Sequence, residues 1–144
     1  SLPHLLVVHL PEAGRAGVTH GWDSTEYREA LRTVDGAMKS VLSLFQEYSL
    51  SGRTVVVVTA LSGKGIDPGA EAPTTDSPVV PWIVSGTGIK HGQLIRQPVS
   101  IMDTGATVMK ILKQETHTEW ESQAVEEIFE TAAATPTARP RKKR

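Results

Sequence analysis

The sequence predicts an α/β domain with a mostly parallel sheet. Two short apolar runs, residues 5–10 and 54–59, are typical of strands that are buried on both faces. A long segment of helical periodicity separates them, and the order strand, helix, strand favours a right-handed crossover. A third strand is predicted at residues 79–84, where Pro81 suits an edge or strand-start position.

The segment between the first two strands predicts one long helix with a single buried stripe. Asp23 or Ser24 can cap its first turn, and Glu26 stands three residues after Asp23, as in a capping box. Ser51 and Gly52 end it. The apolar residues at three- and four-residue steps are Tyr27, Leu31, Val34, Met38, Val41, Leu42, Phe45 and Tyr48.

The remaining elements follow from local composition. Residues 11–22 are rich in glycine and are predicted to form a loop. Residues 61–78 are rich in Gly, Pro, Ser, Thr and Asp, so we expect a long surface loop of the kind that carries function in α/β folds. A helix capped by Asp103 is predicted to run to about Leu112, and a shorter one covers residues 122–132.

The composition predicts one folded domain, residues 1–133, followed by a basic flexible tail, residues 134–144. The 144-residue chain contains no cysteine, which excludes disulfides, thiolate nucleophiles and cysteine-based zinc sites. No apolar run approaches the roughly 20 residues of a membrane span. The first ten residues lack the basic region of a secretory signal. We therefore expect a soluble intracellular protein of the cytoplasm, with no membrane partner.

The tail concentrates positive charge. The formal net charge of −1 includes five positive charges in the last six residues, so the rest of the chain carries −6. Such a tail suits an acidic surface, either a microtubule, which would make the protein cytoskeletal, or RNA, and nuclear import or plain solubilisation are alternatives. The predicted interaction residues are Arg139, Arg141, Lys142, Lys143 and Arg144.

Several segments, in order, resemble the second half of type I phosphodiesterases and nucleotide pyrophosphatases of the alkaline phosphatase superfamily. They are LLVVHLPEAGRAGVTHGW, STEYREALRTVDGAMKSVL, GRTVVVVTALSGKG and VPWIVSGTGIKHGQLIRQPVSIMDTGATVMKIL. The resemblance spans residues 5–129 and is most specific in the last stretch, with its Gly-x-Gly-Ile-Lys strand end and Val-Ser-Ile-x-Asp before a helix. It implies a truncated alkaline-phosphatase-like three-layer sandwich that lacks the first half and its nucleophile.

The resemblance also implies where metal ligands would lie. The family holds two metals, usually zinc, with an Asp-x-x-Gly-His loop, an Asp-His-Gly loop and a later histidine. Alignment on the shared glycines places Gly14 and Val18 at the first loop's ligands, and Leu61 and Ser62 at the second's. The first three side chains have no donor atom and serine is a poor zinc ligand. The sequence thus predicts degenerate metal positions, no catalytic residue and no cofactor.

Some polar residues could still carry chemistry. His9 and His20 with Glu12 could form a relocated metal site, although histidines satisfied by ordinary hydrogen bonds are the simpler interpretation. Asp67 and Asp76 lie in the long loop, where acidic residues are usually turn formers. The remaining candidates are Lys64, which lacks the spacing of a phosphate-binding loop, Thr59 and Ser62, which lack a histidine at catalytic spacing, and Asp103, expected to be a structural N-cap.

The sequence favours a pseudoenzyme, a non-catalytic structural or interaction subunit of a larger assembly. A sheet truncated beside apolar strands leaves unpaired edges, so we expect protein partners to cover it. One alternative is half of a metal-dependent phosphodiesterase or phosphatase that another chain completes. The other is a binding module for RNA or microtubules that acts through the basic tail.

Overall fold

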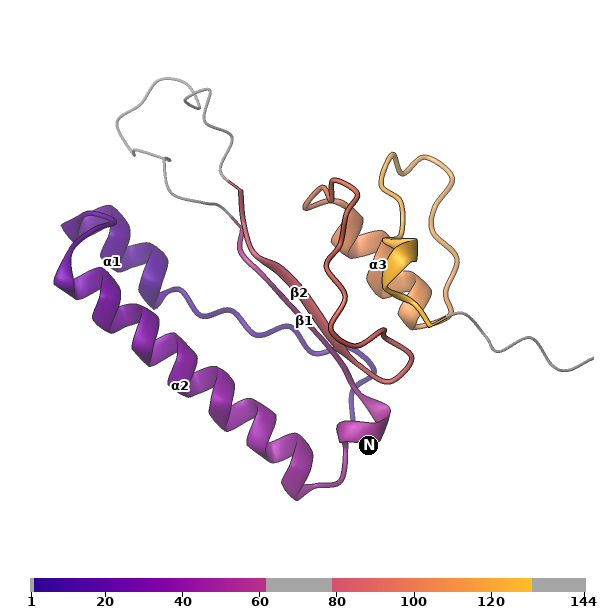
Figure 1. The fold of residues 1–144 in the computed structure, drawn as a ribbon, viewed down its shortest axis with the longest axis horizontal. Coiled ribbons are helices and arrows are strands. Elements are labelled where there is room, and N and C mark those ends of the chain that lie inside the picture. Colours follow the sequence, from indigo (N-terminus) through magenta and orange to yellow (C-terminus); the bar gives the residue numbers. More distant parts are fainter. Residues whose placement is uncertain (1, 62–78, 131–144) are drawn as a thin grey trace, which may run out of the picture.

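The computed structural model describes residues 2–61 and 79–130, and Figure 1 shows their arrangement. Three α-helices and two strands form the described part, with a 3₁₀ turn before the first strand and another near the end. In chain order the elements are α1 (Glu12–His20), α2 (Thr25–Glu47), η1 (Ser51–Arg53), β1 (Val55–Thr59), β2 (Trp82–Gly86), α3 (Asp103–Ile111) and η2 (Glu126–Ile128).

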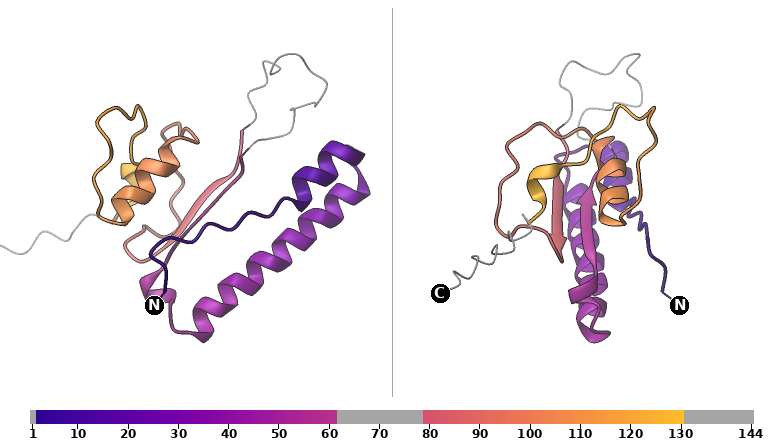
Figure 2. Two further views of the ribbon diagram at one scale, coloured as in Figure 1. Left: turned by 180° about the vertical axis from the view of Figure 1, so that it is seen from behind. Right: turned by 90° about the vertical axis from the view of Figure 1, so that its right-hand side faces the viewer.

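The elements lie on two sides of a central hairpin. In Figures 1 and 2, α1 and α2 run antiparallel to each other on one side of β1 and β2, whereas α3 and the segment after it lie on the other side. The described part is therefore a mixed α and β structure. No helix among residues 2–61 and 79–130 is long and apolar enough to cross a membrane.

Helix α2 confirms the prediction of one long helix. Ser24 is its N-cap, because the Ser24 hydroxyl oxygen accepts a hydrogen bond from the Tyr27 backbone N–H at 3.1 Å. The predicted apolar stripe is present, yet none of the residues of α2 is buried, and Leu31 and Leu42 are 42% and 45% exposed. The stripe is therefore only partly covered by the described residues.

The prediction of a loop over residues 11–22 is wrong, because Glu12–His20 forms α1. Its glycines lower helix propensity, which is why composition suggested a loop, yet the helix forms. Gly17 is buried against the Trp22 ring, which also packs edge-on against Tyr27 with ring centroids 5.4 Å apart. Gly21, with φ 94°, ends the helix, and its N–H donates to the Gly17 carbonyl.

The prediction of a buried strand at residues 5–10 is also wrong. The segment is extended, but its backbone makes no hydrogen bond to any described residue. Leu5 and Val7 are 55% and 80% exposed, so the apolar side chains that suggested burial on both faces are uncovered here. A strand exists only when a neighbouring strand supplies its hydrogen bonds, and none of the described strands does.

The described sheet has two strands, and they pair antiparallel, with Val55 opposite Gly86 and Thr59 opposite Trp82. The predicted crossover and mostly parallel sheet are therefore not formed among the described residues, because the segment at residues 5–10 does not join β1. The third predicted strand is present but shifted, since β2 begins after Pro81. Pro81 has no N–H with which to extend the ladder.

The core lies between the hairpin and the C-terminal segment. Ile89, Val125 and Ile128 are buried together, and Ile89 forms an isolated bridge with Phe129. The helix predicted over residues 122–132 is wrong where it can be judged, since only η2 forms and the chain then extends to make this bridge. Helix α3 confirms the helix predicted from Asp103, ending at Ile111.

We predict that Gly17→Ala destabilises the chain by about 1–3 kcal/mol, because the new methyl group would lie 2.3 Å from a Trp22 ring carbon and must displace it. Gly14→Ala, in the same helix with nothing within 4 Å of the added Cβ, is the matched control and should stabilise by roughly 0.5–1 kcal/mol. Urea unfolding followed by tryptophan fluorescence measures both. Equal effects at the two positions would contradict the contact.

Candidate functional site

The predicted metal positions lie on two separate elements. Gly14 and Val18 are four residues apart on α1 and share one face of the helix. Both are exposed, as is Leu61, which follows β1 and is 79% exposed. Ser62, the fourth position, lies outside the described residues. Gly14 and Val18, which the resemblance assigns to a loop, thus lie within a helix.

The donor atoms at these positions do not fit a divalent metal. Gly14 offers a hydrogen, Val18 an isopropyl group and Leu61 an isobutyl group, and zinc in proteins is bound by nitrogen, sulfur or oxygen. Within residues 2–61 and 79–130, no three His, Asp or Glu side chains come close enough together to hold an ion. The residues described here therefore do not match the metal site that the resemblance implies.

The alternative ligands fare no better. His9 lies in the unpaired N-terminal segment, while Glu12 and His20 occupy opposite ends of α1, roughly 12 Å apart along the axis at 1.5 Å per residue. The relocated site is thus not assembled in the described part of the chain. Asp67 and Asp76 lie outside the described residues. So do Lys64 and the five basic residues of the tail, Arg139, Arg141, Lys142, Lys143 and Arg144.

Thr59 is not placed as a nucleophile. Its hydroxyl oxygen is enclosed at the end of β1 and has no hydrogen-bond partner among the described residues. A nucleophilic hydroxyl needs an adjacent base and access to the substrate. The neighbouring polar contact is instead structural, because the Trp82 indole N–H donates to the Thr104 hydroxyl at 2.9 Å.

Asp103 has a structural role, but not the predicted one. It is the first residue of α3, and Met102 occupies the N-cap position. The Asp103 carboxylate accepts one hydrogen bond from the Ser100 backbone N–H at 2.9 Å and another from the Gln123 backbone N–H at 3.0 Å. It thereby ties the turn before α3 to the segment after it, 20 residues along the chain.

Glu127 is a second carboxylate that organises the backbone, and no sequence pattern indicates this role. Its Oε1 accepts from the backbone N–H groups of Arg96 and Gln97 at 2.7 and 3.2 Å. Its backbone carbonyl accepts from Lys90 Nζ at 2.9 Å and from Gln93 Nε2 at 3.3 Å. All four partners lie about 30 residues or more earlier in the chain, and such long-range pairing has no local pattern.

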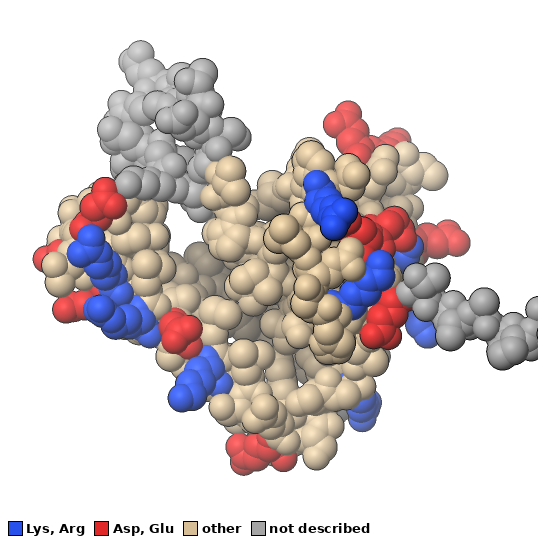
Figure 3. All heavy atoms as spheres, in the orientation of Figure 1, with Lys and Arg blue, Asp and Glu red and all other residues tan. Residues whose placement is uncertain are grey.

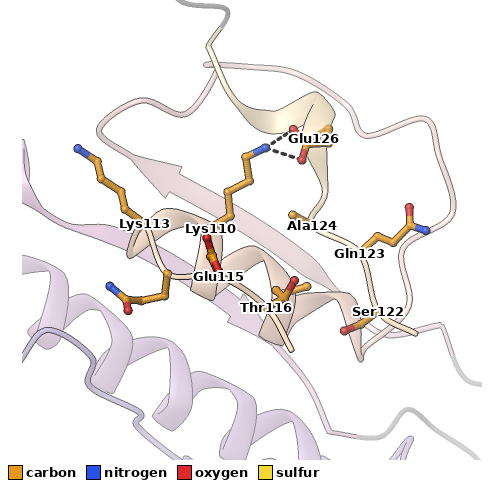
Figure 4. A pocket seen from close by; sticks show the side chains of 10 residues that line it. Lys110, Lys113, Glu115, Thr116, Ser122, Gln123, Ala124 and Glu126 are labelled. Carbon is orange, nitrogen blue, oxygen red and sulfur yellow. Dashed lines mark hydrogen bonds and ion pairs between the residues drawn. The ribbon is translucent and has the colours of Figure 1, made fainter. Parts of the chain in front are cut away.

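An open polar pocket lies between α3 and residues 114–126 (Figure 4). Lys110 Nζ points at Glu126 and contacts both carboxylate oxygens at 2.5 Å, and it also lies 5.2 Å from the centre of the Phe129 ring. Lys113 points away from this pair. The pocket lining has no histidine. Its Lys110 ammonium group is already paired with the Glu126 carboxylate. No hydroxyl in this described lining hydrogen-bonds to a carboxylate or lysine side chain, so the pocket shows no activated nucleophile.

An apolar groove of about 570 Å³ follows the outer side of β2. One charged side chain, Lys90, contributes to its lining, and no carboxylate does. Figure 3 shows the same distribution on a larger scale, with charged side chains gathered over α1, α2 and the region of α3 and an uncharged centre over the hairpin. The groove is lined by Val79, Val80, Trp82, Ile83, Val84, Ile89, Lys90, Gln93, Leu94, Ile95, Gln97, Val99 and Ile128.

Comparison with known proteins gives one match. The family model described as type I phosphodiesterase / nucleotide pyrophosphatase matches residues 2–69, which include α1, α2 and β1. No curated protein matches the chain, and no solved structure does. The family match supports the predicted relationship to the alkaline phosphatase superfamily. It includes Gly14, Val18, Leu61 and Ser62.

We predict that Asp103→Ala destabilises the chain by about 2–4 kcal/mol, because two backbone N–H groups lose a charged acceptor. Asp103→Asn keeps one acceptor oxygen and should recover part of this loss. Asp35→Ala, at an exposed position of α2, is the matched control and should change stability by less than about 0.5 kcal/mol. Urea unfolding checks the ranking, which a purely catalytic Asp103 would not produce.

Proposed function

We propose that this chain is a pseudoenzyme, a phosphodiesterase-like fold that has lost its metal ligands and serves as a structural or interaction subunit of a larger assembly. The observation that carries the proposal is the absence of donor atoms at Gly14, Val18 and Leu61, inside the segment that matches the family. Family members stabilise a transferring phosphoryl group with two metals, and this chemistry requires those donors.

The exposed apolar surface supports the proposed role as an interaction subunit. Soluble monomers rarely expose large contiguous apolar patches, and such patches usually mark contact sites. In this chain the N-terminal segment exposes a run of apolar residues, and further large apolar side chains are exposed in β2 and next to the ends of β1 and β2. The most exposed large apolar side chains are Leu2, Leu6, Val7, Tyr48, Leu61, Val79, Leu94 and Met102, at 61–96%.

The proposal also includes the fold of the assembled protein. The order of the motifs resembles the second half of the enzyme fold, and the hairpin lies between helices on two sides (Figure 2). This arrangement supports a three-layer sandwich. Its mostly parallel sheet would require strands from elsewhere in the assembly, because β1 and β2 alone are antiparallel.

The purified chain should contain far less than one zinc ion per molecule and should not hydrolyse bis(p-nitrophenyl) phosphate with zinc or manganese added. The physical reason is the missing donor set. Metal is measured by mass spectrometry after dialysis, and hydrolysis by release of nitrophenolate.

His9→Ala and His20→Ala are the control variants for this test. A trace activity that both variants retain is a contaminant. Stoichiometric zinc together with turnover that either variant abolishes would contradict the proposal, because it would mean that new ligands have replaced the family's.

A further inference from the structure

The outer edge of β2 has free backbone hydrogen-bonding groups. The Thr87 N–H donates to the Thr54 carbonyl, so residues 83, 85 and 87 direct their backbone groups toward β1 in this antiparallel register. Alternation then directs the N–H and C=O groups of Trp82 and Val84 to the outer side. No described residue bonds to those groups there.

Pro81 does not block this edge. By the same alternation, Pro81 directs its nitrogen toward β1, so the missing N–H ends the β1–β2 ladder and leaves the outer edge intact. The chain before it continues the edge with Val80 and with Val79, which is 96% exposed. The unpaired edge therefore runs along residues 79–84.

The edge faces the apolar groove. Leu94, Ile95 and Val99 contribute to its lining together with β2, and Leu94 is 83% exposed. A free strand edge beside apolar side chains is the arrangement that binds an extended peptide by strand addition. The bound peptide receives main-chain hydrogen bonds from the strand and places alternate side chains against the groove.

The same chain carries a segment with matching properties. Residues 5–10 are extended, lack backbone partners among the described residues and expose Leu6 and Val7 by 66% and 80%. Six extended residues span roughly 20 Å, the length of the edge along residues 79–84. The segment has no Asp, Glu, Lys or Arg, so its entry into the groove would not desolvate a full charge.

Within one chain, residues 5–10 do not lie at the outer edge of β2. In Figures 1 and 2 the N-terminal segment passes on the β1 side of the hairpin, whereas the chain that follows β2 lies on the β2 side, and residues between 93 and 99 in that part contribute to the groove lining. A second β2 edge is a poorer occupant, because it would bring its own residues 93–99 into the groove. Residues 5–10 have no flanking segment of this kind, so they could enter the groove alone.

We infer that residues 5–10 of a second copy add a strand to the outer edge of β2 and that the exchange is reciprocal, giving a two-fold dimer. Each chain contributes the 6 residues of its segment and the 13 residues that line its groove, near the lower limit of the roughly 20–30 residues a side of a standard interface. The inference rests on the proposed function only in that the chain acts through protein contacts.

Sedimentation velocity of the 144-residue chain tests the dimer. Val7→Glu, in the segment, and Leu94→Glu, in the groove, should each raise the dimer dissociation constant at least tenfold. Val18→Glu on α1 and Leu61→Glu after β1 place the same charge at exposed apolar positions elsewhere and should leave it unchanged. A monomeric wild-type chain, or a dimer that tolerates either charge at residues 7 and 94, overturns the inference.

Cross-linking identifies which chain supplies the strand. Because the chain has no cysteine, Val7→Cys and Leu94→Cys can be introduced in separate, differently tagged chains. Mixing the two variants under mild oxidation should give a disulfide that joins the two differently tagged chains. A mixture of the Val18→Cys and Leu94→Cys variants should give no such disulfide. In the double variant Val7→Cys/Leu94→Cys, a bond within one chain at high dilution overturns the inference. Failure here leaves the zinc and hydrolysis results unaffected, so the two proposals fail separately.

Discussion

The described structure depends on the pairing of the chain after β2 with the chain around η2. The Lys90 N–H donates to the Ile128 carbonyl and the Glu130 N–H to the Gly88 carbonyl, which joins segments about 40 residues apart. This pairing buries Ile89 and Ile128 against the hairpin. The fully buried Thr107 then ties α3 to the same segment, because its hydroxyl accepts from the Val125 N–H at 3.0 Å and donates to the Asp103 carbonyl at 2.7 Å.

Among the described residues, no comparable long-range backbone pairing covers the other side of the hairpin, where α1 and α2 lie. Helix α2 has no buried residue, and the segment that precedes α1 makes no backbone hydrogen bond. The family match includes this less covered side, whereas the buried core lies outside it, apart from residues of β1. The segment that the family model matches is therefore also the segment whose apolar side chains are least covered by the described residues.

Local patterns predicted the elements whose stability is local, and they failed where tertiary contacts decide. The three- and four-residue repeat and the Ser24 cap were sufficient to predict α2. Helix α1 was missed because its glycines suggested a loop, and composition does not reveal that Gly17 lies against the Trp22 ring. The strand at residues 5–10 was predicted from side chains alone, but a strand also requires a partner backbone. The absence of donors at Gly14 and Val18 could be read directly, since it is a property of residue identity, whereas the bonds of Glu127 could not.

The positions of Gly14 and Val18 on α1 bear on their lack of metal-binding atoms. Residues four apart on a helix face the same side, and two histidines at this spacing can bind zinc in other proteins. Gly14 and Val18 keep the spacing but carry no donor atom. If these positions correspond to ligands, as the resemblance implies, the difference is one of side-chain chemistry, since the helix backbone places the two residues on one face.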